Sequence, residues 1–380
     1  MDRPPQKILI IAGEESGDMR AASLVHEIKH LCPNVEFTGI AGDRCRHEGV
    51  KTFTDMTELA VIGFTEVIKN IMRIKRIFDL TLEHARQQRP DLAILVDYPG
   101  FNLRLAKELK KMGIKVIYYV SPQVWAWKES RVETIKRVVD RMLVLFPFEK
   151  DLYARHGYTA DFVGHPLIDE AHAHTPRDIF LNQINLNPQK PVLAILPGSR
   201  DKEISRHLPV MLQAAQLVQK EQPDVQLVLL KAKNLSKDIF TSYLLNAPTG
   251  IKISEDYYDA LNACDAAMVC SGTATLETGL MAKPMVVVYK TSWATWFIAR
   301  MVVKIPCIAL VNIVAGRKIA EELLQNNASP EAIAQETLKL LEPAHALKMR
   351  HDLSSIKTLL GASGASQRAA RVVIEELSEK

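Results

Sequence analysis

Two short segments in the second half of the chain carry residue types suited to holding phosphate. Residues 271–277 read SGTATLE and follow the apolar run Ala266–Cys270, while residues 197–200 read PGSR and follow the apolar run Val192–Leu196. A glycine lets the backbone approach a ligand closely, and a helix N-terminus offers free N–H groups and a positive dipole end. Because an arginine can also fork onto phosphate oxygens, the two segments together predict a diphosphate site.

Arg200 should contribute more to such a site than the helix dipole does. A hydrogen bond to a charged group contributes about 1.5–3 kcal/mol, whereas the dipole contributes about 0.3–1 kcal/mol. Glu277, one turn into the helix, can accept from a ribose diol. The predicted binding residues are Gly198, Ser199, Arg200, Gly272, Thr273, Thr275 and Glu277. The alternatives are an ordinary capped turn at 271–277 and an ordinary surface position for the arginine.

The sequence contains no Asp-x-Asp pair. Two carboxylates at that spacing would hold a diphosphate through a metal ion. We therefore expect no metal and no other cofactor, with Arg200 and helix N–H groups in place of Mg²⁺.

A second candidate site lies in the first half of the chain. Residues 12–18 read AGEESGD and include Glu14 and Ser16, and the buried run Leu92–Val96 ends at Asp97. Carboxylates beside a loop repel phosphate, so this loop is better suited to a hydroxyl-bearing acceptor. Partial burial would raise the pKa of Asp97 and make it a usable general base. The alternative is that these residues cap turns; His165 is a weaker acid/base candidate.

The elements that must position these residues are short apolar strands alternating with helix-like stretches. Continuous apolar runs such as Leu92–Val96 and Val192–Leu196 are typical of parallel sheets covered on both faces. Two such series predict an α/β protein with two doubly wound, Rossmann-like domains facing a central cleft. The expected ranges are an acceptor domain at 1–170, a nucleotide domain at 171–345, and C-terminal helices at 346–380 that pack back on the first domain or on a partner subunit.

Composition narrows the class of protein further. The 380 residues carry a net charge of only +4, and the five cysteines form no CxxC pair. A nucleic-acid partner is therefore not expected, and neither is a disulfide framework or a zinc site. No apolar run approaches the roughly 18–20 residues needed to cross a bilayer. A protein of the cytosol or of a membrane surface is expected.

Residues 57–80 could provide contact with a membrane surface. Apolar side chains follow helical spacing there and are flanked by cations, which describes an interfacial helix. The predicted membrane residues are Phe64, Val67, Ile68, Ile71, Arg73 and Phe78. The alternative is a core-facing helix with a solvated basic edge. A second stretch, residues 293–304, carries two tryptophans and spaced cations and could extend the same surface.

Read together, the motifs resemble those of the lipid-A-disaccharide synthase family. The matching segments include AGEESGD (12–18), VDYPGFN (96–102), YVSPQVWAWKESR (119–131), LPGSRDKEI (196–204), SGTATLE (271–277) and NIVAGR (312–317). The resemblance implies the GT-B architecture and transfer of 2,3-diacylglucosamine from its UDP derivative. The acceptor would be 2,3-diacylglucosamine 1-phosphate (lipid X). The implied products are the β-1,6-linked disaccharide 1-phosphate and UDP, with inversion at the anomeric carbon.

The resemblance also implies roles for single residues. Asp97 matches the position of the base, and Glu14 and Ser16 match an acceptor loop. Contacts to UDP are implied for Arg200, Glu277, Asn312 and Gln325. The family is peripheral to the cytoplasmic face of the bacterial inner membrane and can form homodimers. The alternatives are another GT-B enzyme, such as a UDP-GlcNAc 2-epimerase or a MurG-like transferase, and a non-catalytic nucleotide-sugar sensor.

Overall fold

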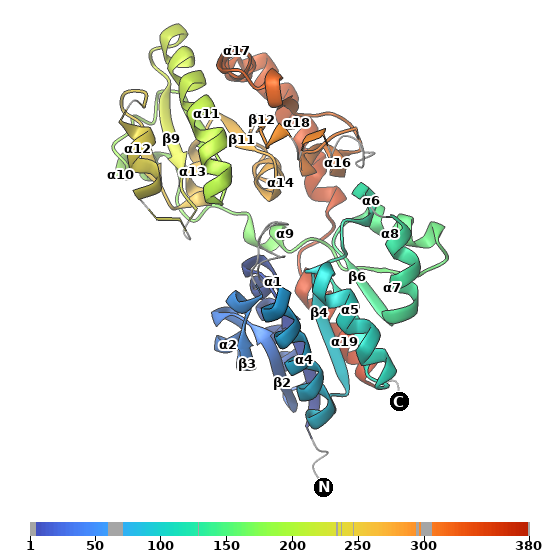
Figure 1. Ribbon diagram of the computed structural model, residues 1–380. Coiled ribbons are helices and arrows are strands. Elements are labelled where there is room, and N and C mark those ends of the chain that lie inside the picture. Colours follow the sequence, from blue (N-terminus) through green and yellow to red (C-terminus); the bar gives the residue numbers. More distant parts are fainter. Residues whose placement is uncertain are drawn as a thin grey trace. The chain divides into compact units, whose positions relative to one another are not determined.

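The computed structural model describes residues 5–59, 71–127, 129–232, 235–236, 238–245, 247–293, 296–297 and 306–378. The chain forms two compact units (Figure 1). Unit 1 comprises Met1–Pro166 together with Gly361–Lys380, and unit 2 comprises Leu167–Leu360.

Unit 1 is built on a seven-stranded parallel sheet with the order β3-β2-β1-β4-β5-β6-β7. The strands are β1 (Gln6–Ala12), β2 (Val35–Ala41), β3 (Lys51–Asp55), β4 (Leu92–Val96), β5 (Lys115–Tyr119), β6 (Arg141–Val144) and β7 (Asp161–Phe162). The strand order reverses between β1 and β4, where Ala12 pairs with Val96. Doubly wound sheets bind ligands at the carboxyl ends of the strands at such a reversal, so the loops after these two strands are the expected site of unit 1.

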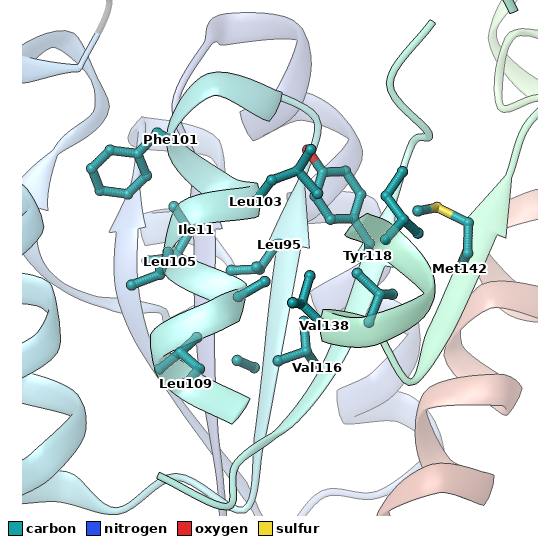
Figure 2. Close-up of a cluster of buried hydrophobic side chains, with 14 of the residues drawn as sticks. Ile11, Leu95, Phe101, Leu103, Leu105, Leu109, Val116, Tyr118, Val138 and Met142 are labelled. Atoms are coloured by element: carbon teal, nitrogen blue, oxygen red, sulfur yellow. The ribbon is translucent and has the colours of Figure 1, made fainter. Parts of the chain in front are cut away.

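The helices of unit 1 cover this sheet. They are α1 (Glu15–Leu31), α2 (Asp43–His47), η1 (Met56–Glu58), α4 (Ile71–Gln88), α5 (Pro99–Lys111), α6 (Val124–Trp127), η2 (Glu129–Arg131), α7 (Val132–Val138), α8 (Pro147–Arg155) and α19 (Ala365–Ser378). Figure 2 shows how Leu105 and Leu109 of α5 meet Leu95 and Val116 of the strands in the buried core. This packing fixes the start of α5, and therefore Asp97 just before it.

Unit 2 repeats the plan with a six-stranded parallel sheet of order β10-β9-β8-β11-β12-β13. The strands are β8 (Val192–Leu196), β9 (Gln226–Leu230), β10 (Lys252–Ser254), β11 (Ala266–Cys270), β12 (Met285–Tyr289) and β13 (Glu321–Leu324). Here the order reverses between β8 and β11, with Leu196 paired to Val269. The two predicted phosphate-binding segments therefore leave neighbouring strands at the same edge of one sheet.

The helices of unit 2 connect these strands and close the core. They are α9 (Leu167–Glu170), α10 (Arg177–Gln183), α11 (Asp201–Glu221), α12 (Asp238–Leu244), α13 (Tyr257–Ala263), α14 (Thr273–Leu280), α16 (Leu310–Ala315), η3 (Gln325–Asn327), α17 (Pro330–Leu341) and α18 (Pro343–Leu359). The prediction of two doubly wound parallel-sheet domains is confirmed.

The predicted domain limits need one correction. The boundary lies at Pro166/Leu167, close to the expected residue 170. The segment 346–380, however, is not one body. Helix α18 stays with unit 2, because Leu353 and Ile356 are buried there against α14 and α17, whereas α19 packs against α1 of unit 1.

Candidate functional site

The loop after β8 is shaped by a carboxylate that sequence analysis did not single out. The Ser199 backbone N–H donates a 3.0 Å hydrogen bond to Glu203 Oε2, and Arg200 Nη1 lies 3.5 Å from Glu203 Oε1. Gly198 has φ +122°, and a Cβ there would come 2.6 Å from the Glu203 carboxylate. Glu203 stands three residues after Arg200, the N-cap of α11. The bonded N–H belongs to Ser199, the residue before the N-cap, so Glu203 does not form a capping box and no sequence pattern marked this role.

Arg200 and the start of α14 share the edge of the unit 2 sheet. The Arg200 side chain is 57% exposed. Gly272 and Thr273 are exposed, and Gly272, the N-cap of α14, offers no side chain to occupy the first-turn N–H groups. A helix N-terminus of this kind combines N–H donors with positive dipole charge. The arrangement of a guanidinium and a helix N-terminus therefore suits a dianionic diphosphate.

Glu277 is oriented by two tyrosines that sequence analysis missed. Tyr257 Oη lies 3.2 Å from Glu277 Oε2, and Tyr258 Oη lies 3.0 Å from Oε1, each hydroxyl donating. Burial and the nearby Glu277 charge raise the pKa of both phenols, so they remain donors. A carboxylate oxygen has more than one lone pair. Glu277 can therefore still accept from a ribose diol while its orientation is fixed.

Thr275 and Asn312, which were both predicted to contact UDP, make their hydrogen bonds inside the protein. Thr275 is fully buried, and its Oγ1 donates to the carbonyl oxygen of Gly272 at 2.9 Å. The Asn312 amide nitrogen donates to Ala320 O and Glu322 Oε1, both at 2.8 Å, and its oxygen accepts from the N–H groups of residues 319 and 320. These bonds use the hydrogen-bonding capacity of the Asn312 amide to position the loop before β13, and its contact with UDP stays a prediction.

Gln325 likewise holds the backbone. It is 7% exposed and has φ +51°. Its Oε1 accepts from Thr291 N at 2.8 Å and its Nε2 donates to Thr291 O at 3.1 Å. The residue lines a pocket of about 280 Å³ together with Arg206, Lys290 and Trp293. Its amide therefore fixes the segment after β12, and because the residue also lines this pocket, its contact with UDP stays a prediction.

In unit 1, the turn after β4 carries a backbone strained around the predicted base. Asp97 and Tyr98 both have left-handed φ values, +48° and +46°. Asn102 Nδ2 donates to the Asp97 carbonyl oxygen at 2.8 Å, and Tyr118 Oη donates to the same oxygen. Strain of this kind persists where the surroundings determine it, and it is concentrated at active sites. The carbonyl group is thus fixed and the carboxyl side chain is left for other contacts.

The Asp97 carboxyl group has the electrostatic character of a general base. Burial raises its pKa, and the positive charge of Arg20 opposes that shift. A carboxylate with a raised pKa accepts a proton more readily near neutral pH. The geometry and pKa direction thus favour the predicted role.

The acidic residues after β1 have different roles. Asp18 is 1% exposed and accepts from the N–H groups of Gly42 and Arg44 at 2.7 and 3.1 Å, so it caps α2. Glu14 is the N-cap of α1, and burial, followed by the charge of Glu14, raises the pKa of Tyr98. Ser16 is exposed in the first turn of α1. Glu14 and Ser16 thus remain candidates for holding an acceptor, because they follow β1, the strand that pairs with the one before Asp97.

Two further titratable groups of unit 1 are buried. His165 is 2% exposed, and burial, followed by the charge of Arg20, lowers its pKa to about 3. The imidazole is thus neutral and a poor general acid. Glu149 is 3% exposed and accepts from the N–H groups of Leu145 and Phe146, and burial raises its pKa to about 8. Sequence analysis did not single out this buried acid.

The predicted membrane stretch is described only in part. Phe64, Val67 and Ile68 lie outside the described residues. Ile71 is 59% exposed at the start of α4, and Arg73 lies beside it with Nη1 3.9 Å from Glu58 Oε2. The ring of Phe78 meets the edge of Phe101 at 5.5 Å and packs against the core. Phe78 is half-buried and packs against the core, so this contact favours the core-facing alternative for its ring, and a membrane contact there stays a prediction.

The described helices include none that is long and apolar enough to cross a membrane.

Comparison with known proteins covers nearly the whole chain. The sequence profile of the family described as Lipid-A-disaccharide synthetase matches residues 8–375. The lipid-A-disaccharide synthase of Geobacter sulfurreducens is 42% identical over 376 residues, with 98% of each chain covered. That of Myxococcus xanthus is 42% identical over 379 residues, with 99% of each chain covered. Such identity over the full length identifies the family.

Solved structures show a similar fold at low sequence identity. A putative UDP-N-acetylglucosamine 2-epimerase from Listeria monocytogenes matches with a TM-score of 0.66 at 15% identity, covering 99% of this chain and 98% of that one. The glycotransferase of kitacinnamycin also gives 0.66 at 15% identity, covering 98% and 100%. These neighbours confirm the GT-B architecture shared by glycosyltransferases and epimerases.

Proposed function

Because the chain belongs to the lipid-A-disaccharide synthetase family, whose members are glycosyltransferases of lipid A biosynthesis, we propose that it joins two diacylated glucosamines. The donor is UDP-2,3-diacylglucosamine and the acceptor is 2,3-diacylglucosamine 1-phosphate (lipid X). The glycosyl group passes to the acceptor 6-hydroxyl, giving the β-1,6-linked disaccharide 1-phosphate and UDP.

The observation that carries this proposal is that Arg200 and the N-terminus of α14 follow the carboxyl ends of two neighbouring strands, β8 and β11, with Glu277 in the same helix. UDP leaves as an anion, so preorganised positive charge and N–H donors stabilise it as the glycosidic bond breaks. Glu277 holds the ribose, oriented by its two tyrosines. The leaving-group stabilisation is assigned to the guanidinium and the helix N–H groups.

Asp97 supplies the base of the reaction. Its carboxylate removes the proton of the acceptor 6-hydroxyl while the oxygen attacks the anomeric carbon, and the configuration there inverts. Burial supports this role because it raises the pKa of the carboxyl group. Glu14 and Ser16, on the neighbouring loop, accept from and donate to acceptor hydroxyls.

Both substrates carry acyl chains, so the enzyme must meet them at a membrane. We assign peripheral contact with the cytoplasmic face of the inner membrane to the start of α4. Ile71 and Met72 are 59% and 76% exposed there, and Arg73 can pair with anionic headgroups. A homodimer is part of the same proposal.

One incubation tests the proposal directly. Purified protein is mixed with UDP-2,3-diacylglucosamine and lipid X in the presence of a chelator, and products are identified by mass spectrometry. The disaccharide 1-phosphate and one equivalent of UDP are expected, and Asp97→Asn serves as the inactive control. The fold is shared with epimerases, so UDP-GlcNAc is the contrasting substrate. Epimerisation of UDP-GlcNAc without disaccharide formation would overturn the proposal.

A further inference from the structure

The side chain of His207 lies buried at the carboxyl ends of three neighbouring strands of unit 2, with 1% of its surface exposed. Its Nε2 accepts a 2.9 Å hydrogen bond from the N–H of Lys290, directly after β12. Its Nδ1 lies 3.2 Å from the carbonyl oxygen of Pro197, directly after β8. The same nitrogen lies 3.3 Å from Sγ of Cys270, the last residue of β11.

These contacts determine where the His207 proton lies. A backbone N–H can only donate, so Nε2 must be unprotonated and Nδ1 carries the proton of the neutral ring. Nδ1–H then donates to the oxygen of Pro197, with Cys270 Sγ as a second, weaker acceptor. The Cys270 thiol donates onward to the carbonyl oxygen of Ser271 at 3.6 Å. Burial lowers the pKa of His207, which keeps the ring in this neutral form.

Each of the three contacts adjoins a segment that the donor site uses. Pro197 leads into the loop of Arg200, and Cys270 leads into Gly272 and the N-terminus of α14. Lys290 leads into Thr291, which Gln325 holds from the end of β13. Neighbouring strands lie about 4.8 Å apart, so one imidazole ring can contact the ends of three of them. Its contacts therefore constrain the spacing of the segments that bind the diphosphate.

We propose that His207 is a positioning residue of the donor site: its ring ties the ends of β8, β11 and β12 together and so sets the spacing between Arg200 and the N-terminus of α14. The inference rests on the proposed function, since it takes 197–200 and 271–273 as the segments that hold UDP. His207 itself need not touch the nucleotide. The competing role is that of an ordinary core side chain that contributes stability only.

Three substitutions separate the contacts that the ring makes after β8 and after β12. His207→Phe keeps a ring and removes the hydrogen bonds to Lys290 and Pro197 together with the weaker contact to Cys270. In His207→Gln the amide oxygen is near the place of Nε2 and can accept from Lys290 N–H. In His207→Asn the amide nitrogen is near the place of Nδ1 and can donate to Pro197 O. Val218→Ala is the matched control, because Val218 is fully buried on the same helix but lies eleven residues further along, about 16 Å away.

The measurement is the dissociation constant of UDP by calorimetry, with the thermal midpoint of each variant recorded in parallel. His207→Phe should bind UDP about 10-fold more weakly, which corresponds to about 1.4 kcal/mol of binding free energy. His207→Gln and His207→Asn should fall between His207→Phe and the unchanged protein. Val218→Ala should lower the midpoint while leaving the dissociation constant unchanged.

An unchanged dissociation constant in His207→Phe overturns the inference. So does a loss of affinity that simply follows the thermal midpoint across all four variants. If His207→Phe does not fold, the Gln and Asn variants decide: both must bind UDP more weakly than Val218→Ala. An unchanged protein that fails to bind UDP refutes the donor site itself, which is a distinct result from failure of the His207 variants.

Discussion

The backbone N–H of Ser199 donates a 3.0 Å hydrogen bond to the carboxylate of Glu203, one turn into α11. This bond closes the loop that presents Arg200, and the same carboxylate approaches the guanidinium at 3.5 Å. Glu203 therefore has two opposed effects on an anionic ligand. It shapes the loop that receives the diphosphate, and it places a negative charge beside it.

Two substitutions at Glu203 should separate these effects. Glu203→Gln keeps an oxygen that accepts from Ser199 N–H and removes the charge, so UDP should bind equally well or more tightly. Glu203→Ala removes the acceptor, and loss of one such hydrogen bond costs about 1 kcal/mol, or about fivefold in affinity if the loop must reform on binding. Titration calorimetry with UDP checks both variants. Equal weakening in the two would show that the charge, not the loop bond, matters.

Arg200→Ala should weaken UDP binding more than any other single change at this edge of the sheet. A charge-assisted hydrogen bond contributes about 1.5–3 kcal/mol, so the dissociation constant should rise about 10- to 150-fold. Lys220→Ala is the control, because Lys220 is exposed in the last turn of the same helix. This substitution also removes one positive charge, but about 30 Å along the helix from Arg200. Similar losses of UDP affinity in both variants would show that Arg200 acts only through the net charge of the protein and not through a direct contact with UDP.

Asp97→Asn should abolish disaccharide formation while UDP binding persists, since the proposed UDP residues belong to unit 2. The rate of the unchanged enzyme should fall as the pH drops through the pKa of Asp97, because only the ionised carboxylate accepts a proton. That pKa lies above the usual 3.8. Exposed Asp79 gives the control Asp79→Asn, which should keep full turnover. Appreciable turnover by Asp97→Asn would remove Asp97 as the base.

The same pKa shift has a consequence for stability. A carboxyl group whose pKa is raised on folding stabilises the folded protein only while it is protonated. Its contribution to the free energy of unfolding is therefore present at pH values below the pKa that the group has in the unfolded chain. That contribution is lost as the pH rises through the folded pKa. At pH 7 the buried carboxylate is therefore unfavourable, and Asp97→Asn should raise the thermal midpoint. A lower midpoint at pH 7 would indicate that other contacts of the carboxylate outweigh its burial.

The sequence was sufficient for the two parallel sheets and for placing the predicted binding segments at the ends of their strands. Continuous apolar runs such as Val192–Leu196 mark parallel strands, and the glycine or aspartate that ends such a run marks the site edge. What the sequence did not reveal was which polar side chains face a ligand and which hold the backbone. Asn312 and Thr275 belong to recognisable motifs, yet Thr275 accepts from the N–H of Val311 and Asn312 donates to Ala320 and Glu322, which lie outside those motifs. His207 escaped notice for the same reason, because its partners come from three different strands.

Asn312→Ala should therefore act mainly on stability. The change leaves the buried N–H groups of residues 319 and 320 without their acceptor, and each such loss costs about 1–3 kcal/mol. A clearly lower thermal midpoint is expected, with a smaller change in UDP affinity than Arg200→Ala produces. The thermal midpoint and the UDP dissociation constant should therefore be measured for both Asn312→Ala and Arg200→Ala. A UDP affinity loss in Asn312→Ala as large as that in Arg200→Ala, at an unchanged midpoint, would restore a direct contact.

Membrane contact at the start of α4 can be tested apart from the core, because exposed and packed side chains are close together there. Ile71 and Met72 are exposed, whereas Phe78 packs on Phe101. The double change Ile71→Gln and Met72→Gln should reduce binding to vesicles containing anionic lipid and leave the thermal midpoint unchanged, since neither side chain contributes to the core. Phe78→Ala should do the opposite, lowering the midpoint through lost packing while the folded fraction still binds vesicles. Undiminished vesicle binding by the double variant would place the membrane surface elsewhere on the protein.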